Sequence, residues 1–127
     1  MSYIVIEGNV TADATLREFA SRRTGELIPI SNATVAVNDR RYNAETETWV
    51  DTGRTFYEVT VTGTEAIHFA ASATKGTRVL AAGNCYVEED TDGEGGKRIR
   101  RRLSADSHGV STKFGAVAAK EAATTAS

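Results

Sequence analysis

The chain has 127 residues, of which 40% are hydrophobic and 25% charged, enough for one domain with a modest core. No apolar run approaches the roughly 20 residues of a membrane helix, and the start, Met1-Ser2-Tyr3-Ile4, lacks the pattern of a signal peptide. The formal net charge of -2 excludes a strongly basic protein. We therefore expect a cytoplasmic protein with no membrane contact.

The residues that most often carry chemistry are few and scattered. A single cysteine, Cys85, excludes an intrachain disulfide and fits a reducing compartment. His68 and His108 are distant from it in the sequence, and no third orienting group accompanies them. The acidic run 90–94 resembles a calcium loop, but its twelfth position is Arg101. We expect a turn there, no metal or cofactor, and no enzymatic activity.

The first half of the chain is predicted to form strands. Residues 3–10 alternate in polarity, with Gly8 interrupting the run, and residues 16–20 can form a short strand before a turn at 22–25. Residues 27–38 show the clearest period-two pattern. The polar segment 39–53 is predicted to be a long loop.

The second half begins with another strand, residues 54–62, which places Phe56 and Tyr57 on opposite faces. The sequence leaves open whether Phe56 or Tyr57 points into the core. A helix follows, with Thr64 as N-cap and Lys75-Gly76 as its stop signal. Two more strands are expected at 79–87 and 99–105. Residues 116–127 are predicted to be a frayed helix or a disordered tail.

Charges separate sharply in the last hairpin. An acidic run, Glu88 to Glu94, precedes a basic run, Lys97 to Arg102. A turn at 93–96 would place Asp90 opposite Arg98 and Glu88 opposite Arg100, with Val87, Cys85, Ile99 and Leu103 buried on the other face. Arg101, Arg102 and Lys97 would then stay available to phosphate. Two interpretations remain open: a nucleic-acid contact or a solvated hairpin.

Three segments in a fixed order carry a family resemblance. They are Gly8-Asn9-Val10-Thr11-Ala12-Asp13-Ala14-Thr15-Leu16-Arg17, then Asn32 to Tyr42 with its Ala36-Val37-Asn38, then Lys75-Gly76-Thr77-Arg78-Val79-Leu80-Ala81-Ala82-Gly83. Together they resemble the bacterial single-stranded DNA-binding proteins, whose pattern is G-N-L-x-x-D-P-x-L-R, A-V-N-R-x-Y and K-G-x-x-V-x-V-x-G. The resemblance spans residues 3–107.

The resemblance implies an all-β OB-fold, a five-stranded Greek-key barrel with one helix between strands 3 and 4. The predicted order of elements agrees with it. We expect residues 1–109 to form the OB-fold single-stranded DNA-binding domain and residues 110–127 a short C-terminal tail, partly helical or disordered.

By resemblance, the protein binds and protects single-stranded DNA without sequence specificity during replication, recombination or repair, as a homotetramer or dimer near the nucleoid. The alternative is an OB-fold protein-interaction module, such as a primosome or assembly factor, with weak DNA binding. Family members usually end in an acidic tip that recruits replication and repair proteins. Residues 121–127 have no acidic cluster, so partners that depend on such a tip are not expected.

Single-strand binding needs aromatic faces for bases and cations for phosphates. Our candidates are Arg17, Arg22, Arg23, Arg40, Arg41, Tyr42, Trp49, Arg54, Phe56, Arg78, Tyr86, Lys97, Arg98, Arg100, Arg101 and Arg102. The resemblance aligns family stacking aromatics with Arg41, beside Tyr42, and with Phe56. It aligns two more with Thr62 and Asp90, which are losses, and Tyr86 is the ring nearest the second. We therefore expect this protein to bind single-stranded DNA more weakly than family members that keep these aromatics, and its affinity to fall more steeply with salt.

Overall fold

The computed structural model describes residues 1–117, which form six strands and one helix. The elements are β1 (Ser2–Val10), β2 (Thr15–Ala20), β3 (Leu27–Asn43), β4 (Thr48–Thr62), α1 (Thr64–Ser72), β5 (Arg78–Thr91) and β6 (Lys97–Val110). Most of the predicted tail, from residue 118 onward, lies outside the described residues. No helix within residues 1–117 is long and apolar enough to cross a membrane.

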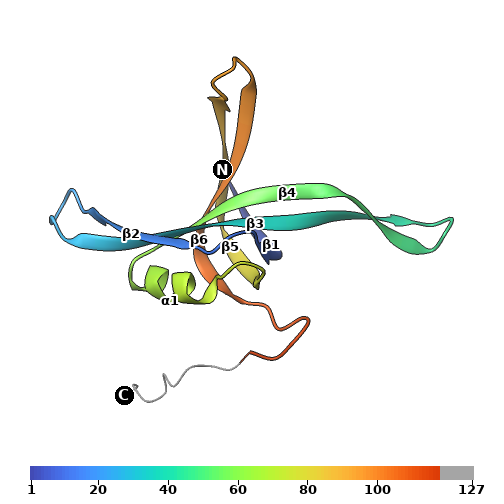
Figure 1. Cartoon of the computed structure of the whole chain (residues 1–127), viewed down its shortest axis with the longest axis horizontal. Coiled ribbons are helices and arrows are strands. Elements are labelled where there is room, and N and C mark those ends of the chain that lie inside the picture. Colours follow the sequence, from blue (N-terminus) through green and yellow to red (C-terminus); the bar gives the residue numbers. More distant parts are fainter. Residues whose placement is uncertain (118–127) are drawn as a thin grey trace.

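The strands form a sheet that closes on itself. Its order is β1-β5-β6-β4-β3-β2, and β1 also pairs with β3, at Asn9 opposite Ala36 and Val10 opposite Val35. All pairings are antiparallel except β4 with β6, which is parallel. Since β2 continues β1 after a short bend, the barrel has five strands, with α1 beneath the sheet (Figure 1). The predicted OB-fold is confirmed.

Alternate residues of the strands fill the barrel. Val35, Val59 and Leu103 are completely buried. The rest of the core comes from Ile6, Val10, Ala33, Val61, Val79 and Ala81, and from Ala66, Phe69 and Ala73 at the helix. The predicted N-cap was wrong: Gly63, at a φ of 87°, caps α1 without a side-chain hydrogen bond. A positive φ suits glycine, so backbone conformation decides this helix start.

Close backbone contacts require glycine at two positions, Gly8 and Gly83. A Cβ on Gly8 would overlap the carbonyl oxygen of Ala36, where β1 crosses β3. A Cβ on Gly83 would overlap the carbonyl oxygen of Ser104, beside the register shift between Ala82 and Gly83. These are the points at which strands bend to close the barrel, so both positions need the smallest residue.

The loop predicted for residues 39–53 was wrong. β3 and β4 instead continue as a hairpin that projects well beyond the barrel (Figure 1). Tyr42 faces Trp49 across the two strands, and Arg40 faces Asp51. A bulge follows Asp39, and Glu47, with a φ of 53°, lies in the turn. Cross-strand pairs of polar and aromatic residues hold this hairpin together, and such pairs leave no alternating apolar pattern in the sequence.

The hairpin of β5 and β6 has the predicted register. Glu88 lies opposite Arg100 and Asp90 opposite Arg98, which confirms the predicted register. Asp90 also pairs with Arg98, but Glu88 pairs with Arg102 instead of Arg100. The predicted burial of Val87 and Ile99 was wrong, since they are 59% and 54% exposed. The hairpin extends past the barrel (Figure 1), so its outer half lies away from the core.

Candidate nucleic-acid interface

The outer face of β3 and β4 carries an exposed aromatic ring at its centre. Phe56 lies opposite Ala36 and is 48% exposed. Its neighbour Tyr57 points the other way and packs against the core, so of the two rings only Phe56 belongs to the outer face. Asn38 and Arg54 form the next cross-strand pair along this face.

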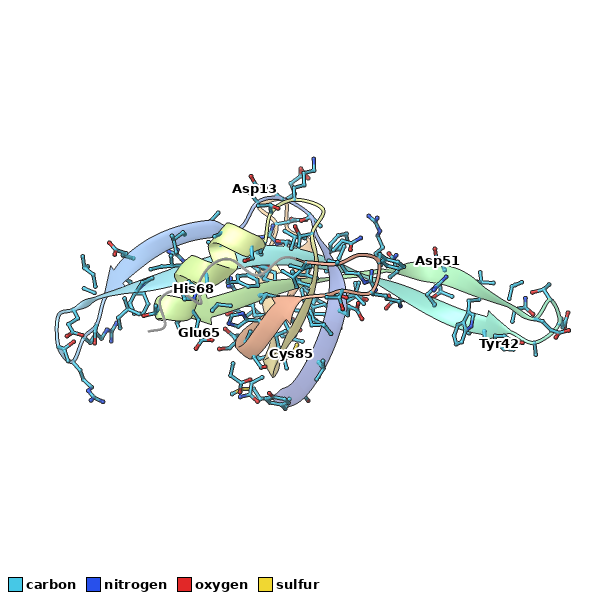
Figure 2. All side chains as sticks on the ribbon, turned by 90° about the horizontal axis from the view of Figure 1, so that it is seen from below. Asp13, Tyr42, Asp51, Glu65, His68 and Cys85 are labelled. Carbon is cyan, nitrogen blue, oxygen red and sulfur yellow. The ribbon has the colours of Figure 1, made fainter. Side chains whose placement is uncertain are left out.

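Farther along the hairpin lies a pair of aromatic rings. The centroids of Tyr42 and Trp49 are 5.4 Å apart with an interplanar angle of 64°, and the side chains are 48% and 61% exposed. Tyr42 lies six residues after Ala36 on β3 and shares its face by alternation. Arg41 lies on the opposite face. Figure 2 shows Tyr42 toward the tip of the hairpin and Asp51 closer to the barrel.

Another aromatic on this side was missed from the sequence. Phe19 on β2 lies opposite Ile28 and is 42% exposed. Arg17, two residues earlier, shares its face. Thr15 on the same face lies opposite Asn32, whose Oδ1 accepts a hydrogen bond from Thr60 of β4. The alternation of Arg17 and Phe19 was a signal in the sequence that could have found this ring.

A network of ion pairs occupies the outer face where β4 meets β6. Arg100 donates from Nε and Nη2 to the two carboxylate oxygens of Glu58, each at 2.7 Å. The Nε of Arg102 donates to Glu88 at 2.7 Å, and its Nη1 lies 3.9 Å from Glu58. The hydrogen bonds from Arg100 lower the pKa of Glu58, and the same pairing raises the pKa of Arg100. Both groups therefore stay charged at neutral pH.

This network corrects the expectation that Arg102 is available to phosphate. Only about 27% of its side chain is exposed, and Glu88 engages it. Other predicted cations are paired too: Arg40 with Asp51 at 3.2 Å, Arg78 with Glu7 at 2.7 Å, Arg98 with Asp90 at 3.5 Å and Lys97 with Glu89 at 3.9 Å. The arginine-rich surface is thus partly neutralised by the protein itself.

Six of the candidate cations form no ion pair within 4 Å among residues 1–117. They are Arg17, Arg22, Arg23, Arg41, Arg54 and Arg101. Arg22 and Arg23 lie in the turn between β2 and β3. Arg101 shares the face of Leu103, and Lys97 lies on that same side of β6.

Strand alternation brings most of the candidates onto one side. Tyr86 is 40% exposed and lies opposite Arg102. The outer face contains Arg17, Arg40, Tyr42, Trp49, Arg54, Phe56, Tyr86, Arg98, Arg100 and Arg102. Arg78 also points outward, on β5 next to β1. The arrangement offers rings for stacking and guanidinium groups for phosphate.

Of the residues considered for catalysis or metal binding, His68 and His108 line one pocket beside the helix, and Cys85 is not part of it. Figure 2 shows Glu65 and His68 on the helix and Cys85 on a strand away from them. His108 Nε2 lies 2.9 Å from Glu65 Oε1, and its ring packs edge-on against Phe69 at 5.3 Å. Within residues 1–117, no group of three His, Cys, Asp or Glu side chains is placed to hold a metal ion.

A closed five-stranded barrel with one helix and an outer face of exposed rings and arginines defines an OB-fold protein with features of a nucleic-acid interface. Comparison with known proteins agrees. The sequence profile of the Single-strand binding protein family matches residues 1–111, and the chain belongs to that family.

Several proteins named Single-stranded DNA-binding protein are similar to this chain. The Single-stranded DNA-binding protein of Mycobacterium tuberculosis is 32% identical over 111 residues, covering 87% of this chain and 65% of that protein. The protein of the same name from Paenarthrobacter aurescens is 31% identical, covering 87% of this chain and 62% of that protein. The chain therefore matches less than two thirds of the length of these relatives.

The fold comparison gives a structural neighbour of almost equal extent. It is the crystal structure of a small single-stranded DNA-binding protein from Streptomyces coelicolor, with a TM-score of 0.75 and 25% sequence identity. The similarity covers 90% of this chain and 97% of that one. The neighbour is thus similar over nearly its whole length.

Proposed function

We propose that this protein binds and protects single-stranded DNA without sequence specificity during replication, recombination or repair, and that it catalyses no reaction. The observation that carries the proposal is the row of exposed rings on one outer face: Phe56 in the centre and Tyr42 with Trp49 on the projecting hairpin. Membership of the Single-strand binding protein family supports it.

The geometry suits a single strand better than a duplex. Exposed rings stack on unpaired bases, and any base can stack because each has a π-face. Along β3, Ile28 and Tyr42 are 14 positions apart, which is about 45 Å at the rise of a strand. Such a face can contact several successive nucleotides. Stacking on exposed rings favours binding without sequence preference.

Titration with oligo-dT of about 35 nucleotides tests the proposal. Trp49 is the only tryptophan, so its fluorescence reports on the projecting hairpin alone. We expect sub-micromolar binding with quenching at low salt and a loss of affinity at moderate salt, as counterions compete for the arginines. Failure to bind at low salt would leave the alternative, an OB-fold protein-interaction module such as a primosome or assembly factor.

The ion-pair network gives a sharper prediction. Glu58→Gln removes the carboxylate that engages Arg100, so this arginine becomes available to a phosphate. We expect about two- to fivefold tighter binding at low salt, from the roughly 0.5–1 kcal/mol of such a pair. The plot of log affinity against log salt should steepen by about 0.7, the value for one more phosphate contact with a single strand.

Glu18→Gln is the matched control, because it makes the same change in net charge. Glu18 is exposed on β2, lies on the face opposite Phe19 and has no ion pair within residues 1–117. If both variants tighten binding equally, general charge and not the release of Arg100 is responsible.

We also propose self-association as a homotetramer or dimer. Among residues 1–117, residues 2–8 of β1 pair only with β5, which leaves their other edge open, and Tyr3 and Val5 are 58% and 66% exposed. An open edge with exposed apolar residues favours pairing with a second chain. Light scattering at several concentrations should give a mass of two or four chains. A constant mass of one chain would contradict this.

We also propose limits for the DNA-binding domain and a location in the cell. We assign the OB-fold single-stranded DNA-binding domain to residues 1–109 and a short C-terminal tail to residues 110–127. We place the protein in the cytoplasm, at the nucleoid, where single-stranded DNA is exposed. Imaging a fluorescent fusion of the full chain tests the location: a uniform distribution would contradict association with the nucleoid.

A further inference from the structure

A polar cavity lies beside the outer face, between the end of β1 and the base of the long hairpin. Its volume is about 370 Å³, and it is lined by Glu7, Asn9, Ala36, Asn38, Arg40, Asp51, Arg78, Lys113 and Phe114. Three cations and two carboxylates make its formal charge +1. Both carboxylates are engaged, Asp51 by Arg40 and Glu7 by Arg78.

The wall formed by Lys113 and Phe114 comes from the segment that follows β6. Ser111 anchors this segment, since its Oγ donates to Glu7 Oε2 at 2.7 Å and its backbone N–H donates to the Arg78 carbonyl at 2.8 Å. The hydrogen bond from Ser111, with that from Arg78, lowers the pKa of Glu7. The backbone N–H of Lys113 donates to Ser111 Oγ. The segment is thus held against the barrel.

Phe114 is not a core residue. It is 79% exposed, and the guanidinium carbon of Arg78 lies 5.2 Å from the ring centroid, with Lys113 Nζ at 5.6 Å. A ring held by cations while most of its surface is open to solvent is a ready platform for stacking. Lys113 forms no ion pair within 4 Å among residues 1–117, so its charge is available.

The remaining polar groups complete a site for a nucleotide. The side-chain amides of Asn9 and Asn38 line the cavity, and neither makes a side-chain hydrogen bond within residues 1–117. Each amide offers both donors and an acceptor, which suit the edge of a base. Asn38 lies opposite Arg54, next to Phe56, so the cavity borders the outer face.

We propose that this cavity binds one nucleotide of the single strand, with its base stacked on Phe114 and its phosphate at Lys113. The inference rests on the proposed function and extends the binding path beyond the barrel. The family profile ends at residue 111, so the two residues that carry this site lie outside the matched region. The strand would pass from Phe56, across Asn38, to Phe114.

The test compares variants of the full chain by anisotropy of a labelled oligo-dT at several salt concentrations. Phe114→Ala should weaken binding about fivefold or more, the lower end for loss of one stacked base. Phe114→Tyr keeps an aromatic ring and should retain most of the wild-type affinity. Lys113→Gln should reduce the salt slope by about 0.7. Val117→Ala, a truncation of a 51% exposed side chain three residues farther on, should bind like the wild type.

The outcomes separate the two proposals. If the wild type does not bind the oligonucleotide, the proposed function itself fails. If the wild type binds and Phe114→Ala stays within twofold of it, the nucleotide site is refuted. Tighter binding by Phe114→Ala would also refute it, since the segment would then be covering the face and competing with DNA. Equal melting temperatures of the variants confirm that folding is unchanged.

Discussion

Replacing Leu103 with alanine is expected to lower the free energy of unfolding by about 2–5 kcal/mol, the range for truncating a buried leucine. Leu103 is completely buried and lies opposite Cys85 of β5 and Val59 of β4. It therefore joins three strands at the parallel seam of the barrel. The cavity left by the lost methyl groups cannot close without moving those strands, so a value in the upper part of the range is expected.

Ile99→Ala is the matched control for this change. Ile99 lies four residues earlier on β6, on the same face of the strand, but it is 54% exposed. Urea denaturation should show that the free energy of unfolding falls by no more than about 0.5 kcal/mol at this surface position. Equal losses in the two variants would contradict the assignment of the core to the inner half of β6.

Replacing Phe56 with alanine is expected to weaken the binding of single-stranded DNA by about 1–3 kcal/mol, or 5- to 150-fold. The ring occupies the centre of the outer face and its loss removes a stacking platform. Because Phe56 is 48% exposed and not part of the core cluster, folding should be affected far less than binding. Fluorescence titration of Trp49 measures the affinity, and thermal unfolding measures the stability.

Two further variants make this result specific. Phe56→Trp keeps an aromatic surface and should retain most of the affinity. Leu27→Ala removes an exposed apolar side chain, 63% accessible, from the opposite side of the β2–β3 hairpin and should leave binding unchanged. If Phe56→Ala binds as the wild type does, base stacking at the centre of the outer face is excluded.

The arginines are expected to contribute less than their number suggests. Five of those on the outward-facing surface are held by a carboxylate of the protein: Arg40, Arg78, Arg98, Arg100 and Arg102. A phosphate must displace that carboxylate before it contacts the arginine, so each exchange yields only part of the free energy of an ion pair. Rings that need no such exchange then carry a larger share of the affinity.

Local patterns in the sequence were enough for the barrel strands. Period-two alternation predicted the strands around Val35 and Val59, and the acidic and basic runs predicted the register of Glu88 with Arg100. These features depend on neighbours along the chain or across one short turn. The order of elements and the quoted segments then led to the OB-fold.

The hairpin of residues 39–53 could not be predicted in this way. Its strands are held by Tyr42 with Trp49 and Arg40 with Asp51, which are pairs between residues seven and eleven apart. In the sequence such residues look like a polar loop, because no alternating apolar face packs on a core. Phe19 is a different case, since its alternation with Arg17 on β2 was visible in the sequence.

By itself the sequence determined the strand pattern, the resemblance and the chemical kinds available for binding. Only the tertiary structure decided which arginines are neutralised, since Glu58 and Arg100 are 42 residues apart and meet only where β4 and β6 pair. It also decided that Phe114 lies beside Arg78 and lines the same cavity as Asn38. Alternation along a strand is a local property, whereas charge pairing and cavity walls depend on contacts that exist only after the barrel closes.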